Sequence, residues 1–76
     1  MKRYFFDYRA RDRSLFDYRG QEFPSAQGAL EFAEAIAHDL MHSLSNNWTG
    51  WSVEVRNAEG EKFFSLPVEW EGLQAA

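Results

Sequence analysis

The sequence predicts an α+β fold of the order β-β-α-β-β, in which two antiparallel hairpins flank one amphipathic helix packed on the sheet. Apolar and polar residues alternate near both ends of the chain, a central alanine-rich stretch has helical periodicity, and two Asx-x-x-Gly sequences mark turns. We expect one domain over residues 1–76. Its expected elements are strands over residues 2–9, 14–17, 51–56 and 61–68 and a helix over residues 26–45.

The first strand is predicted from "KRYFFDYRA", where Tyr4, Phe6 and Tyr8 fall on one face. Its last letters, FDYR, return at residues 16–19, and there Gly20 follows them. An Asp at the first place of a turn hydrogen-bonds the backbone two residues on, and a Gly at the fourth place accepts positive φ. We therefore expect the first copy to lie in a strand and the second to open a turn, so the repeat does not mark a duplicated site.

The helix is predicted from "PSAQGALEFAEAIAHDLMHSLSNN", with Ser25 as its N-cap and the two asparagines at its end. At 100° per residue, one polar side carries His38 and His42. The opposite side is apolar and should lie on the sheet; it comprises Ala26, Ala29, Leu30, Ala33, Ile36, Ala37, Leu40, Met41 and Leu44.

The second hairpin repeats the turn signal of the first. Asn57-Ala58-Glu59-Gly60 separates two alternating stretches, and Pro67 places the last strand, or its end, at an edge of the sheet because proline cannot donate to a ladder. Replacing Gly20 with alanine is expected to cost about 1 kcal/mol or more, and Gly60→Ala is expected to behave alike.

Composition restricts the class of protein. A 76-residue chain buries only ~60% of its unfolded surface, and the absence of cysteine removes disulfides and thiolate metal sites, which leaves self-association as the main additional source of stability. With 45% apolar and 17% aromatic residues, the chain is not disordered. No stretch is long enough to span a membrane, and the apolar run at residues 4–6 is too short for a signal peptide, so we expect no membrane association and a cytoplasmic protein.

Charge is distributed unevenly. Residues 1–19 contain six basic and three acidic side chains, whereas residues 20–76 contain two basic and nine acidic ones. Such a molecule can pair head to tail or offer a basic patch, made of Arg9, Arg11 and Arg13, to a polyanion. The acidic net charge of −4 and the lack of a glycine-rich or RNP-like strand argue against nucleic acid.

These stretches resemble a family of short bacterial proteins classed as a domain of unknown function. Its members open with Met-x-Arg-Tyr-Phe-Phe-Asp, continue with Asp-x-x-Gly-x-Glu and an Ala-rich helix, and close with Val-x-Val-Arg-[Asp/Asn]-x-x-Gly. The corresponding pieces here are Met1–Asp7, Asp17–Phe23, Ala26–Leu44 and Val53–Gly60. The resemblance implies the fold and brings no substrate, cofactor or catalytic residue.

No catalytic, cofactor-binding or metal-binding residue is predicted. His38 and His42 have the i, i+4 spacing of a zinc-binding helix face, but only Glu31 or Glu34 is left to complete a site. The carboxylates of Asp7, Asp17 and Glu22 could converge for acid–base chemistry, yet no nucleophile stands beside a base.

Three aromatic residues at the margins of the expected core form the predicted partner surface: Phe32, Trp48 and Trp70. The function expected from these observations is a small non-enzymatic interaction or structural module that forms a homodimer, with an unknown protein partner as a further possibility. An antitoxin-like regulator is the alternative, because the passage from residue 20 into the helix resembles HicB-type antitoxins. Those proteins usually add a DNA-binding segment for which this chain has little room.

Overall fold

The computed structural model describes residues 1–42, 48 and 50–68 of the chain. In the order of the sequence, its elements are β1 (Lys2–Arg9), β2 (Ser14–Leu15), β3 (Gln21–Phe23), α1 (Ala26–Met41), β4 (Ser52–Asn57) and β5 (Lys62–Pro67). Trp70 and the expected last turn of the helix, residues 43–45, lie outside the described residues.

All strands pair antiparallel in one sheet. β1 pairs with β4 along one edge and with both β2 and β3 along the other, while β5 pairs with β4 and forms an outer edge. The predicted α+β fold of two hairpins joined through a helix is therefore confirmed, and so is the prediction that the strand containing Pro67 lies at an edge.

The second strand differs from the prediction. It ends at Leu15 instead of residue 17, and a further short strand, β3, follows at residues 21–23. The physical reason is the turn that begins at Asp17, which takes the chain away from the β1 ladder and returns it at Gln21, four residues later.

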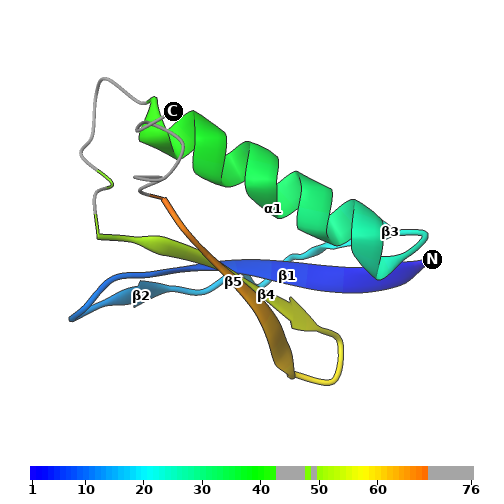
Figure 1. Cartoon of the computed structure of the whole chain (residues 1–76). Helices are drawn as coiled ribbons and strands as arrows, with labels where there is room; N and C mark the ends of the chain where they lie inside the picture. Colours follow the sequence, from blue (N-terminus) through cyan, green and yellow to red (C-terminus); the bar gives the residue numbers. More distant parts are fainter. Residues whose placement is uncertain (43–47, 49, 69–76) are drawn as a thin grey trace.

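The protein has two layers (Figure 1), with α1 lying along one face of the sheet. Ala29, Ala33 and Ala37 are completely buried, and their small side chains let the helix backbone approach the strands closely. Aromatic and β-branched residues of the central strands complete the core: Tyr4, Phe6, Val53 and Val55. Ser25 is the N-cap residue as predicted, although its side chain makes no capping hydrogen bond.

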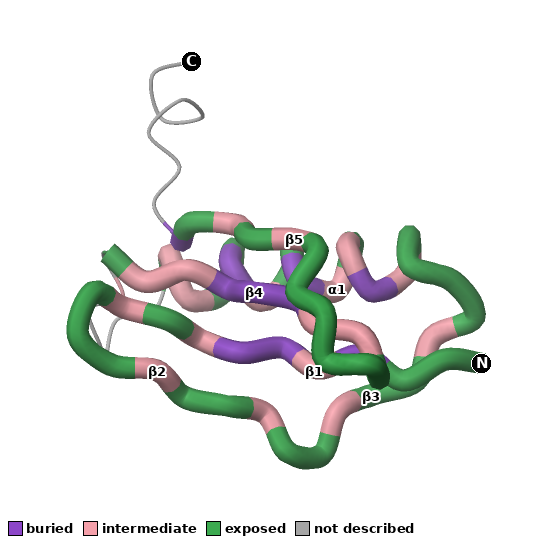
Figure 2. Tube along the Cα trace, turned by 90° about the horizontal axis from the view of Figure 1, so that it is seen from below, coloured by how far each residue is buried: buried purple, intermediate pink, exposed green. Residues whose placement is uncertain are grey.

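No helix of the described residues covers the other face of the sheet, which Figure 2 views directly. It is charged: Glu54 is only 8% exposed and pairs with Arg9 at 3.2 Å and with Lys62 at 3.3 Å. The Arg56 guanidinium lies 4.8 Å above the centre of the Phe5 ring. No helix among the described residues is long and apolar enough to cross a membrane.

Candidate functional site

The edge of the sheet beside β1 is interrupted between β2 and β3. Tyr8 pairs with Leu15 and Tyr4 pairs with Gln21, but the five residues 16–20 leave the strand. Between these two short ladders, the backbone N–H of Phe6 donates instead to Asp17 Oδ2 at 3.1 Å. A side-chain carboxylate thus replaces the carbonyl that a continuous strand would offer, and the β1 backbone stays satisfied at the break.

The same carboxylate closes the turn. Asp17 Oδ1 accepts hydrogen bonds from the backbone N–H groups of Arg19 and Gly20, both at 3.0 Å. Gly20 has a φ of +72°, so the predicted turn and its positive φ are confirmed. The second turn is built in the same way: Asn57 Oδ1 accepts from Glu59 N, and Gly60 has a φ of +89°.

The aspartates of the two FDYR copies meet in one network around Arg56. Arg56 Nε donates to Asp7 Oδ2 at 2.7 Å, and its Nη2 donates to Asp7 Oδ1 at 3.1 Å and to the Asp17 carbonyl at 3.0 Å. The Asp17 N–H in turn donates to Asp7 Oδ1 at 2.9 Å. The two copies have different structural roles, as predicted: Asp7 is a buried strand residue that pairs with the Arg56 side chain, and Asp17 forms a turn.

The electrostatics of this network favour its charged form. Burial alone would raise the pKa of Asp17, but the hydrogen bonds from Gly20, Phe6 and Arg19 and the nearby Arg56 charge outweigh it and hold the pKa below its ordinary value. Hydrogen bonding to Asp7 raises the pKa of Arg56, although burial opposes it. Both carboxylates are therefore committed to holding the chain in place.

A groove of about 450 Å³ opens where residues 16–20 leave the sheet. Phe6 and Tyr8 form its floor, and burial together with the nearby Asp17 charge raises the pKa of the Tyr8 hydroxyl, which stays neutral. One wall is the segment Leu15–Gly20, and the other is the side of α1 that carries Phe32 and Ile36. We call this feature the edge groove.

The wall formed by residues 15–20 leaves large apolar side chains in water. Leu15 and Phe16 are each 51% exposed, and Tyr18 is 87% exposed. Single exposed apolar residues are common on protein surfaces, but three within four residues beside an apolar groove form a contiguous patch, and such patches mark interaction sites.

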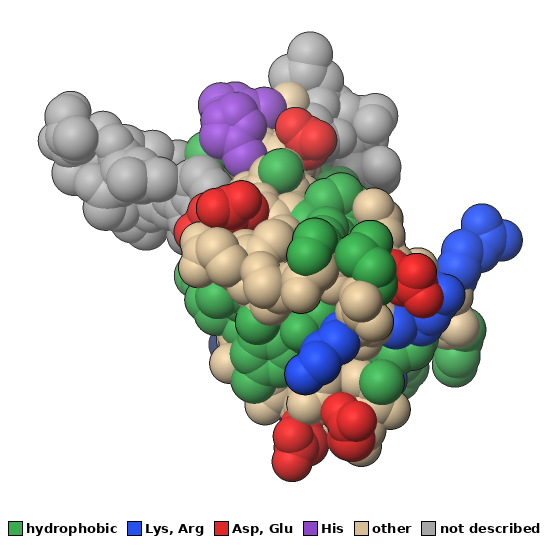
Figure 3. Space-filling model, turned by 90° about the vertical axis from the view of Figure 1, so that its right-hand side faces the viewer, with side chains coloured by type: hydrophobic (Ala, Val, Ile, Leu, Met, Phe, Trp, Pro, Cys, Tyr) green, Lys and Arg blue, Asp and Glu red, His purple; other side chains and the backbone are tan. Residues whose placement is uncertain are grey.

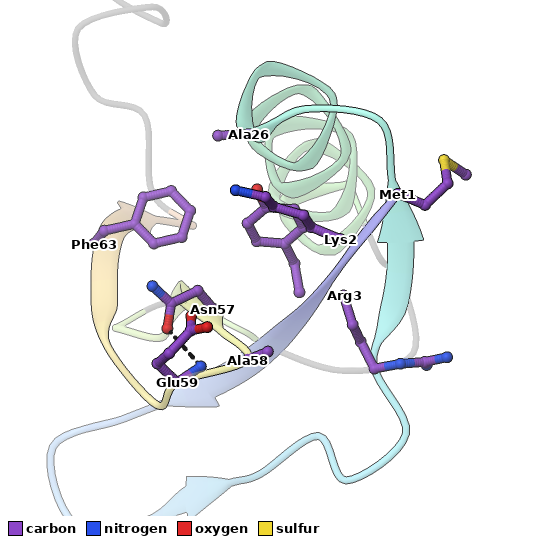
Figure 4. Close-up of a pocket in the computed structure, with 9 residues that line it drawn as sticks. Met1, Lys2, Arg3, Ala26, Asn57, Ala58, Glu59 and Phe63 are labelled. Carbon is purple, nitrogen blue, oxygen red and sulfur yellow. Dashed lines mark hydrogen bonds between the residues drawn. The ribbon is translucent and has the colours of Figure 1, made fainter.

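A second cleft, of about 480 Å³, lies where β1 and α1 begin, at the end of the molecule opposite β2 (Figure 1). In Figure 4, Lys2 reaches over its middle between Ala26 and Phe63, whereas Arg3 points away. Figure 3 faces this end of the molecule and shows hydrophobic side chains mixed with basic ones and bordered below by acidic ones. Lys2 and Glu59 bring opposite charges to the same cleft, and Asn57 Oδ1 already accepts a hydrogen bond from the Glu59 N–H.

Two residues of the predicted partner surface, Phe32 and Trp48, lie among the described residues. Phe32 packs on Phe6 at 5.0 Å between ring centroids and also lines the edge groove. Trp48 is half-buried and packs edge-on against Tyr8 and Trp51, at 5.9 and 5.0 Å. Of these two described residues, Phe32 lines the edge groove and Trp48 does not.

The predicted basic patch is partly neutralised. Arg9 pairs with Glu54, and Arg13 lies 3.9 Å from the neighbouring Asp12. Arg11 is exposed.

The other candidate groups do not assemble into a reactive set. The rings of His38 and His42 lie 4.5 Å apart on α1, and no group of three or more His, Cys, Asp or Glu within the described part of the chain is placed to hold a metal ion. Asp7 and Asp17 do converge, but Glu22 pairs with Arg3 at 3.4 Å instead.

Sequence reasoning missed the apolar residues of the edge groove other than Phe32. The sequence does contain a signal for them. A turn that begins at Asp17, directly after Leu15 and Phe16, predicts that the strand ends there and leaves these apolar side chains exposed. Reading residues 14–17 as one regular strand hid that consequence.

Fold and groove together define a small two-layer α+β protein with one bare sheet face and a broken strand edge. The family model described as "Domain of unknown function (DUF6894)" matches residues 3–69, and the chain belongs to this family, as its resemblance to such a family predicted. Comparisons with the curated proteins and with the solved structures gave no match.

Proposed function

We propose that this protein is a small non-enzymatic interaction module that self-associates as a homodimer through the edge groove. The observation that supports the proposal is a cluster of exposed apolar side chains beside an apolar groove: Leu15 and Phe16, which line the groove, and Tyr18, which belongs to the same segment. In a chain of 76 residues without cysteine, covering this surface adds stability that the thin core lacks.

The exposed area is adequate for a modest interface. Large apolar and aromatic side chains offer up to ~150–250 Å² each, so the exposed fractions of these three leave roughly 350 Å² in water. A standard interface buries about 800 Å² per partner, and the groove floor and the helix wall supply further area. Because association has its own entropic cost, we expect a dissociation constant of about 1–100 μM.

Sedimentation equilibrium across a wide concentration range tests the proposal. The parent is expected to move from 8.9 kDa toward twice that mass as its concentration rises. Phe16→Asp should keep the protein monomeric, because a charge would then have to be buried at the interface. A parent that stays at 8.9 kDa up to high micromolar concentration contradicts the proposal.

Phe63→Asp is the matched control. Phe63 is also a largely exposed phenylalanine, at 43%, but it lines the second cleft instead of the edge groove. This variant should dimerise like the parent. If Phe63→Asp abolishes the dimer and Phe16→Asp does not, the interface lies at the other end of the molecule and the edge groove is not the site.

A further inference from the structure

An exposed basic residue lines one wall of the edge groove and an exposed acidic residue lies on α1 beside the other wall, and we propose that a second copy docks on the groove about a two-fold axis, with Arg19 of each copy facing Asp39 of the other. This arrangement rests on the homodimer proposed above. Arg19 lines the wall formed by residues 15–20. Asp39 does not line the groove, but it follows the lining residues Ile36 by three positions and Phe32 by seven, so helical spacing puts it on the same side of α1.

Both side chains are available for a partner. Each is exposed, and within the described residues neither forms an ion pair. By contrast, the carboxylate of Asp17, which also lines the groove, already accepts hydrogen bonds from three backbone N–H groups. Arg19 and Asp39 are therefore the charges at the groove that a second copy can pair.

A two-fold arrangement uses these charges twice. In an isologous interface, every contact across the two-fold axis occurs twice. A contact between Arg19 of one copy and Asp39 of the other therefore gives two ion pairs. The exposed side chains of Phe16 and Tyr18 on each copy would then lie against the edge groove of the other copy. This arrangement covers the exposed apolar side chains and the edge groove of both copies at once. A head-to-tail pair does not, because it leaves the groove of one copy and the apolar side chains of the other exposed.

Charge reversal tests the pairing. Arg19→Glu and Asp39→Arg are each expected to weaken the homodimer about tenfold or more, because each places two pairs of like charges across the axis. An equimolar mixture of the two variants should form a heterodimer, since both of its contacts again join opposite charges. We expect its dissociation constant to lie within about threefold of the parent value.

The measurement is sedimentation equilibrium of the parent, each variant and the mixture, at low ionic strength where surface charges are least screened. Thermal unfolding of each variant checks that it remains folded, which is expected because both positions are exposed. Recovery in the mixture cannot come from repair of a misfolded chain, because each chain still carries its own substitution.

The outcomes separate the two proposals. A monomeric parent overturns the homodimer and this arrangement with it. A dimeric parent whose affinity is unchanged by both reversals overturns only the pairing of Arg19 with Asp39. If both reversals weaken the dimer and the mixture is no tighter than either variant alone, the two residues do not face each other across a two-fold axis, and the arrangement is wrong.

Discussion

Alanine at Gly20 and at Gly60 should destabilise the protein to different extents, although the sequence alone predicts equal costs. Both glycines have positive φ, +72° and +89°, a region in which a Cβ costs about 1–2 kcal/mol. The surroundings differ. A Cβ on Gly60 meets nothing within 4 Å, whereas a Cβ on Gly20 would lie 2.9 Å from the Tyr4 carbonyl oxygen and 2.9 Å from Phe5 Cε2.

The contact at Gly20 adds to the backbone cost. The Tyr4 carbonyl belongs to β1 and cannot move without disturbing the sheet, so we add about 1–3 kcal/mol for overpacking. The expected losses are about 1–2 kcal/mol for Gly60→Ala and about 2–5 kcal/mol for Gly20→Ala. For a domain of this size, 1 kcal/mol lowers the melting temperature by about 4–8 °C.

Urea denaturation followed by circular dichroism measures both losses. Asparagine separates the two causes, because it tolerates positive φ but still carries a Cβ. Gly60→Asn should be milder than Gly60→Ala, whereas Gly20→Asn should remain strongly destabilising. Equal losses for the two alanine variants would refute the steric argument, and an unchanged Gly60→Ala would refute the argument from φ.

Three further predictions concern charged and titratable groups. Replacing His38 and His42 together with Gln should change the melting temperature by less than about 2 °C, with or without zinc, because both are exposed; a zinc-dependent rise seen only in the parent would contradict this. Arg56→Met should cost about 3–5 kcal/mol in urea denaturation, since it strands the buried carboxylate of Asp7, and a loss below about 1 kcal/mol would show that the pair is not needed. The folded pKa of Asp17 lies below its ordinary value of 3.8, so the stabilising effect of its carboxylate is present above that pH and is lost as the pH falls through the folded pKa. The difference in the free energy of unfolding between the parent and Asp17→Asn should therefore shrink below about pH 4. A difference that stays constant with pH would refute the assignment.

The elements governed by local patterns could be predicted from the sequence. Alternation in residues 2–9 predicted β1 to the residue, and helical spacing predicted the buried alanine face of α1. Both turns followed from Asx-x-x-Gly, because the side-chain acceptor and the positive φ are properties of four adjacent residues. The predicted third and fourth strands differ from β4 and β5 by one residue at each end.

The candidate site depended on contacts that no local pattern contains. The hydrogen bond from Phe6 N–H to Asp17 joins residues eleven apart, and the ion pair of Arg56 with Asp7 joins residues forty-nine apart. β3 has only three residues, too few for alternation to be visible. Without these contacts, neither the break in the strand nor the groove beside it could be located.

The edge groove follows from how the break is held open. A continuous strand over residues 14–23 would satisfy the β1 backbone with its own carbonyls and would place every second side chain on the face that α1 covers, where the groove now lies. Asp17 makes that strand unnecessary: its carboxylate satisfies Phe6 N–H and two N–H groups of the turn, while its own N–H and carbonyl are bound by Asp7 and Arg56. No buried side-chain polar atom among the described residues is left without a partner. Residues 16–20 are thus held in the turn by the hydrogen bonds of Asp17, so the exposure of Phe16 and Tyr18 is part of the fold and does not result from weak pairing.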